Sequence, residues 1–155
     1  MRTIIRNTTT FLLTIILLAN CGFTPMYKDF SNTNFSIKID QMSGNRNINN
    51  KIKNILSKYN FTNKNRNFNV SFDTEYRKNI VAKDTTGAAT EYKIIVETEF
   101  TIISEEFQKQ IKISESFNMQ SMSDKLEEQD YENNINDNLS NTISRKLILQ
   151  LSQIK

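Results

Sequence analysis

The stretch FNVSFDTEYR (residues 68–77) has the clearest period of two in the chain, with Thr74 in phase with its apolar residues. A period of two places Phe68, Val70, Phe72 and Tyr76 on one face of a β-strand and the polar residues between them on the other. A strand with one apolar and one solvated face is typical of an antiparallel sheet that is covered on one side only. This stretch therefore predicts a sheet with a single buried face.

Three further stretches have the same period and predict three more strands. They are residues 35–40, 94–102 and 107–117. Small and polar residues around Gly87 in residues 82–89 predict a turn, and residues 104–106 predict a tight connection.

Two stretches have helical spacing instead. Between about Asn45 and Lys58, apolar residues recur at i, i+3 and i+4, which predicts a short amphipathic helix. The stretch from Lys125 to Ile154 has no Gly or Pro, and its acidic start and basic end match the helix dipole. Its expected buried row is Tyr131, Ile135, Leu139, Ile143, Leu147 and Leu151. The order β-α-β-β-β-α predicts an α+β fold, with a four-stranded, mostly antiparallel sheet and two helices packed on one face.

The N-terminus has the layout of an export signal. Arg2 and Arg6 precede a short apolar run at residues 11–18, which is too short to span a bilayer, and the sole cysteine, Cys21, follows. Leu18-Ala19-Asn20-Cys21 resembles a bacterial lipobox, although Asn20 stands where that pattern usually has Gly, Ala or Ser. The alternatives are a plain secretory signal with an incidental cysteine, or an uncleaved anchor.

The lipobox interpretation divides the chain into three parts. Residues 1–20 are expected to be a signal peptide, residues 21–34 a lipidated tether, and residues 35–155 the folded domain. Cys21 would carry a diacylglycerol on its thiol and an N-acyl chain such as palmitate, which together give stable membrane anchoring. Gly22, a non-acidic residue after the cysteine, is compatible with transfer to the outer membrane.

Composition argues against several classes of function. The chain has no histidine and no tryptophan, and Cys21 is used for lipid, so a Ser-His-Asp or thiol enzyme is excluded and no cofactor or metal is expected. The neighbouring carboxylates Glu97/Glu99 and Glu105/Glu106 fit solvated surface better than a catalytic pair. Removing residues 1–20 lowers the formal charge from +3 to +1, which gives no reason to expect a nucleic-acid partner.

Basic residues are the remaining candidates for a binding site. Arg77, Lys78, Lys83 and Lys93 flank the turn at Gly87, and a hairpin would bring all four to one end of the sheet. Such a cluster suits phosphate-bearing ligands, including anionic lipid. The alternative is a solvated hairpin end whose lysines serve solubility and protect the sheet edge.

The opening of the mature chain, Cys21-Gly22-Phe23-Thr24-Pro25-Met26-Tyr27, resembles the Cys-Gly-Phe-x-Pro-Leu-Tyr opening of LptE, the lipopolysaccharide-assembly lipoprotein, as alphaproteobacteria carry it. The resemblance continues through Arg77, through residues 87–92, where Glu91 replaces a common basic residue, and into the long helix with Tyr131.

This resemblance implies a two-helix, four-stranded domain tethered to the periplasmic face of the Gram-negative outer membrane. It implies an LptD-type β-barrel as partner, with this chain as a plug and chaperone in lipopolysaccharide assembly. It also implies lipopolysaccharide contacts at Arg77 and Lys83. An alternative of another class is a structural or adaptor envelope lipoprotein of the same fold that does not bind lipopolysaccharide.

Overall fold

The computed structural model describes residues 33–62 and 64–154. The expected signal peptide, Cys21 and nearly all of the expected tether lie outside the described residues. The elements follow in the order β1 (Phe35–Gly44), α2 (Arg46–Leu56), the 3₁₀ turn η2 (Ser57–Tyr59), β2 (Arg66–Lys83), β3 (Ala89–Ile103), β4 (Gln108–Gln120) and α3 (Lys125–Gln153). The predicted order β-α-β-β-β-α is confirmed.

The four strands form one sheet in the order β1-β2-β3-β4. β2, β3 and β4 are antiparallel neighbours, whereas β1 runs parallel to β2. Parallel neighbours need a crossover connection, and α2 provides it. The predicted α+β class and mostly antiparallel sheet are therefore confirmed.

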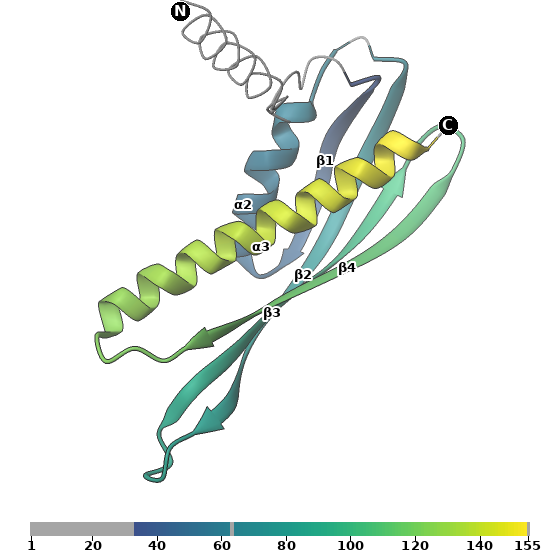
Figure 1. The fold of residues 1–155 in the computed structure, drawn as a ribbon. Coiled ribbons are helices and arrows are strands. Elements are labelled where there is room, and N and C mark those ends of the chain that lie inside the picture. The colour runs from purple at the N-terminus through teal and green to yellow at the C-terminus, as the bar shows by residue number, and fades with distance from the viewer. Residues whose placement is uncertain (1–32, 63, 155) are drawn as a thin grey trace, which may run out of the picture.

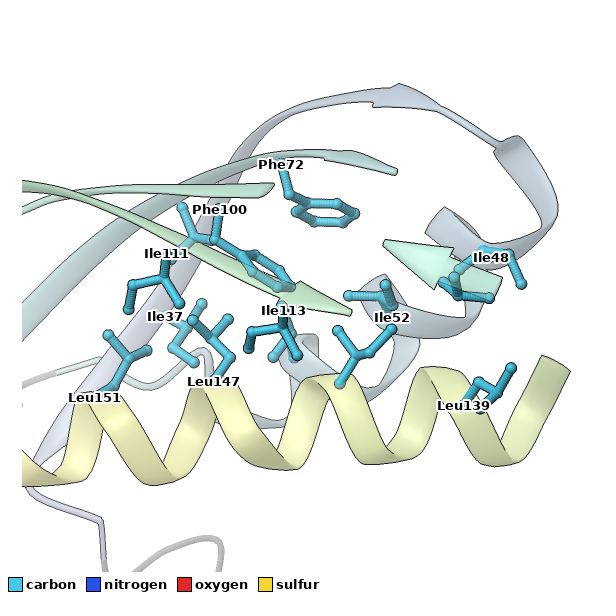
Figure 2. Close-up of a cluster of buried hydrophobic side chains, with 14 of the residues drawn as sticks. Ile37, Ile48, Ile52, Phe72, Phe100, Ile111, Ile113, Leu139, Leu147 and Leu151 are labelled. Carbon is cyan, nitrogen blue, oxygen red and sulfur yellow. The ribbon is translucent and has the colours of Figure 1, made fainter. Parts of the chain in front are cut away.

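Both helices cover the same face of the sheet (Figure 1). Apolar side chains from β1, β2, β3 and β4 meet those of α2 and α3 in a single core, part of which Figure 2 shows. Phe100, Ile52, Ile143, Leu147 and Leu151 are each fully buried. Residues at a period of two supply the strand side of this core, and residues at helical spacing supply the helix side.

Local signals set the helix starts. Asn45 caps α2 by accepting the Ile48 amide at 3.1 Å, and Asp124 caps α3 by accepting the amides of Leu126 and Glu127. Gly44, before α2, has a φ of +84°, and a β-carbon there would lie 2.1 Å from the Thr74 carbonyl oxygen. Only glycine fits this close approach of β1 to β2.

Two expectations need correction. The strands are longer than their regular alternation: β1 continues to Gly44, β2 continues to Lys83 and β3 begins at Ala89. Tyr131 does not join the buried row of α3. It is 37% exposed and meets the ring of Phe117 edge to face, because the first turns of α3 lie over the margin of the sheet at β4.

Among residues 33–62 and 64–154, no helix has both the length and the apolarity needed to cross a bilayer.

Candidate functional site

The β2–β3 hairpin separates the four predicted basic residues between two faces of the sheet and a tip. Lys93 pairs with Asn79 across the hairpin, so Arg77 and Lys93 share the outer face, which is turned away from the helices. Lys78 lies on the opposite face, below α3, and Lys83 is exposed at the end of β2. One end of the sheet holds all four residues, but they do not form one surface.

Lys78 is engaged by α3. Its ammonium lies 2.7 Å from Glu132, 3.6 Å from Glu128 and 4.3 Å from the centre of the Tyr92 ring, and its side chain is 25% exposed. Partial burial by itself would lower the pKa of Lys78, but the hydrogen bond and charge of Glu132 outweigh that effect and raise it. Lys78 therefore joins the hairpin to α3.

Glu128, in the first turn of α3, accepts three hydrogen bonds: from the Met122 amide at 2.9 Å, the Ser121 hydroxyl at 3.0 Å and the Lys125 ammonium at 3.1 Å. It also faces the Lys78 ammonium at 3.6 Å. The hydrogen bond from the Met122 amide, followed by those from Lys125 and Ser121, lowers the pKa of Glu128 from 4.5 to about 2. The Glu128 carboxylate is therefore ionised in the folded protein at neutral pH.

Tyr76 completes this network. Its hydroxyl donates to Glu132 at 2.5 Å, and burial followed by the hydrogen bond and charge of Glu132 raises the pKa of Tyr76 well above 10. A polar cleft of about 420 Å³ adjoins the pair, between α3 and the start of α2. Its wall includes Asn136, which is 5% exposed and whose Oδ1 has no hydrogen-bond partner among the described residues.

The outer face carries like charges directly opposite one another. Asp73 pairs with Glu99 and Glu75 with Glu97 across β2 and β3, an arrangement that destabilises a sheet unless cations intervene. Arg77 lies 2.9 Å from Glu75, and Lys112 of β4 lies 2.7 Å from Glu97. Arg77 is therefore partly neutralised. Lys83 and Lys93 form no ion pair with the part of the chain that the structure describes.

The tip of the hairpin combines exposed apolar side chains with the cation Lys83. Ile80 and Val81 are 53% and 51% exposed and lie between Lys78 and Lys83. The turn that follows is ordered by Asp84, whose carboxylate accepts the amides of Thr86 and Ala88. Figure 1 shows this hairpin projecting beyond the cover of the helices.

Sequence reasoning missed the roles of Tyr76, Glu128 and Glu132. A signal was present: Lys78 falls in phase with Phe72, Thr74 and Tyr76, on the face that packs against the helices. A cation on such a face requires an acidic partner. The acidic first turns of α3 were the available source.

No group of three or more carboxylates among residues 33–62 and 64–154 is arranged to hold a metal ion.

Comparisons with known proteins show the fold but not a family. No protein-family model matches the chain, and no curated protein sequence matches it. The crystal structure of rare lipoprotein B from Shewanella oneidensis superposes with a TM-score of 0.56 at 11% identity, covering 73% of this chain and 94% of that one. The solution structure of an uncharacterized lipoprotein B from Nitrosomonas europaea gives a TM-score of 0.49 at 7% identity, over 79% and 87% of the two chains. The chain therefore shares the fold of rare lipoprotein B.

Proposed function

We propose that this chain is an envelope lipoprotein that is acylated at Cys21 and resides at the periplasmic face of the outer membrane. There it assembles with an LptD-type β-barrel and assists the insertion of lipopolysaccharide. The fold shared with a lipoprotein and the lipobox-like N-terminus both support the lipoprotein part of this proposal.

The observation that carries the binding role is the composition of the hairpin tip. Exposed Ile80 and Val81 stand beside the cations Lys83 and Lys93 on an extension that the helices do not cover. Lipopolysaccharide combines phosphate groups with acyl chains, so such a tip matches both halves of the ligand. Lys78 is assigned to the contact with α3 and is left out of the ligand-binding set.

Charge reversal at the tip tests this role. The double variant Lys83→Glu/Lys93→Glu should bind lipopolysaccharide at least tenfold more weakly, because two phosphate-pairing cations become anions. Lys38→Glu/Lys109→Glu is the matched control: it reverses two exposed lysines in β1 and β4 and should bind as the unmodified chain does. Equal affinity of both variants would refute binding at the tip.

The alternative is a structural or adaptor lipoprotein of the same fold that does not bind lipopolysaccharide. The polar outer face of the sheet favours it, because Arg77 is paired with Glu75 there and a broad polar face suits a protein partner. Unchanged lipopolysaccharide binding in the Lys83→Glu/Lys93→Glu variant, with recovery of periplasmic proteins in place of a barrel, would support this alternative.

A further inference from the structure

The molecule has two distinct ends, which lie at opposite ends of the sheet in Figure 1. One, here named the hairpin end, comprises the end of β2, the turn at residues 84–88, the start of β3 and the start of α3. The other, here named the tether end, comprises the start of β1, the last turn of α2, residues 57–62 and 64–67, the β3–β4 turn and the last turn of α3. Contacts of Phe35 with Arg66 and Tyr59, and of Phe68 with Phe107, hold these segments together.

The tether end is the basic end of the molecule. The last turn of α2 and residues 57–62 and 64–67 contain four cations and no acidic residue: Lys53, Lys58, Lys64 and Arg66. Arg145 of α3 lies near Tyr59 at this end, whereas Lys146 forms an ion pair with Glu115 of β4. Glu105 and Glu106 in the β3–β4 turn are acidic residues of the tether end.

The hairpin end has the reverse balance. The start of α3 brings Asp124, Glu127, Glu128, Asp130 and Glu132 to that end, and Asp84 and Glu91 lie in the hairpin itself. These carboxylates outnumber the cations Arg77, Lys78, Lys83, Lys93 and Lys125. The fold therefore carries a charge dipole along its length, positive where the tether joins β1.

Aromatic side chains accompany the cations at the tether end. Tyr59 is half-buried and stacks on the buried Phe35 with ring centres 6.1 Å apart, and Lys64 lies 5.1 Å from the centre of the half-buried Phe61 ring. The Phe61 amide donates to Ser36 at 3.0 Å, which fixes this segment beside the first residues of β1. Lysines interleaved with aromatic rings are typical of surfaces that meet the headgroup region of a membrane.

We propose that the tether end docks on anionic phospholipid headgroups of the leaflet that holds the acyl chains of Cys21, so that the hairpin end points away from that leaflet. This inference rests on the acylation of Cys21 in the proposed function. The linker of residues 22–34 reaches at most about 45 Å when fully extended, whereas the 18 residues of β2 span about 60 Å. The tether therefore keeps the basic end within about 45 Å of the lipid anchor, and the charges of that end draw it onto the anionic surface.

Hydrogen exchange on the acylated protein in lipid vesicles tests this orientation. The unmodified chain is reconstituted in neutral phosphatidylcholine vesicles and in vesicles with about 30 mol% phosphatidylglycerol. Amides of residues 57–66 should exchange at least threefold more slowly in the anionic vesicles, and those of the hairpin turn at residues 84–88 should not change. High salt should abolish the difference, because it screens exposed charges.

Two matched double variants locate the charges that are responsible. Lys53→Gln/Lys58→Gln removes two of the exposed cations at the tether end and should at least halve the protection by anionic lipid. Lys112→Gln/Lys146→Gln removes two exposed cations between the two ends of the sheet and should leave that protection intact. Equal exchange in both vesicle types, or slowing at residues 84–88 in place of 57–66, would overturn the proposal.

Acylation is read separately, from the mass of the mature N-terminus. If Cys21 carries no acyl chains, the proposed anchoring fails, and the basic end is then tested by itself. The unacylated protein should still cosediment with the phosphatidylglycerol vesicles at low salt and not with the neutral ones. Its absence from both pellets would refute docking of the tether end.

Discussion

Glu128→Gln tests whether the start of α3 is held to the hairpin by an ionised carboxylate. The glutamine keeps the size of the side chain and an oxygen that accepts the Met122 amide, and it removes only the charge that faces Lys78 and Lys125. The loss in the free energy of unfolding therefore reports the charge itself.

Its magnitude follows from the lowered pKa. A fall from 4.5 to about 2 corresponds to at most about 3.4 kcal/mol of stabilisation. The Glu128 side chain is only 9% exposed, but that of its partner Lys125 is 71% exposed, so solvent screens part of the interaction. We expect Glu128→Gln to lower the free energy of unfolding by about 1–2 kcal/mol near pH 7.

The lowered pKa of Glu128 also predicts how the stability difference between the unmodified chain and Glu128→Gln changes with pH. Because the folded-state pKa lies below the unfolded-state value, the stabilisation is complete above about pH 4.5 and is lost as the pH falls toward 2. In urea titrations the difference between unmodified chain and variant should shrink to less than half near pH 3. Glu127→Gln is the control, since Glu127 is exposed in the same turn and should cost a few tenths of a kcal/mol. A difference that is absent, or that is as large near pH 3 as near pH 7, would refute the reasoning.

Three further predictions concern stability and are measured in the same urea titrations. Gly44→Ala should lower the free energy of unfolding by at least about 2 kcal/mol, because the new β-carbon would lie 2.1 Å from the Thr74 carbonyl oxygen. Gly87 has a similar positive φ but open space around it, so Gly87→Ala should lower it by about 1 kcal/mol. Leu147→Ala should cost about 2–5 kcal/mol because Leu147 is fully buried, whereas Leu149→Ala, at a residue that is 59% exposed, should cost less than about 0.5 kcal/mol. Lys78→Met should cost about 1–3 kcal/mol, because it leaves Glu132 without its ammonium partner; a neutral or stabilising result would return Lys78 to the ligand-binding candidates.

The sequence predicted the fold because most of each element has a clear period of its own. Residues 68–77 have a period of two, and the row from Ile135 to Leu151 recurs at i, i+4, so the strand and the helix follow from local pattern. The continuation of the β2–β3 hairpin beyond Arg77 could not be predicted from local pattern, because Ile80 and Val81 are adjacent apolar residues and interrupt the alternation. The structure has register shifts next to this pair, at residues 80–83.

The candidate site was predicted in part. Proximity in the chain placed four cations at one hairpin, but the face that each occupies depends on strand phase and on the distant helix. Lys78 meets Glu132, 54 residues away, and no local pattern encodes that contact. The charge dipole likewise depends on β1 and the start of β2 lying at one end and the start of α3 at the other.

The most direct test of the proposed function is the composition of the complex recovered with this chain from native membranes in mild detergent. The account predicts an acylated Cys21 together with one outer-membrane β-barrel protein and bound lipopolysaccharide. Recovery of the chain without any outer-membrane barrel would contradict it.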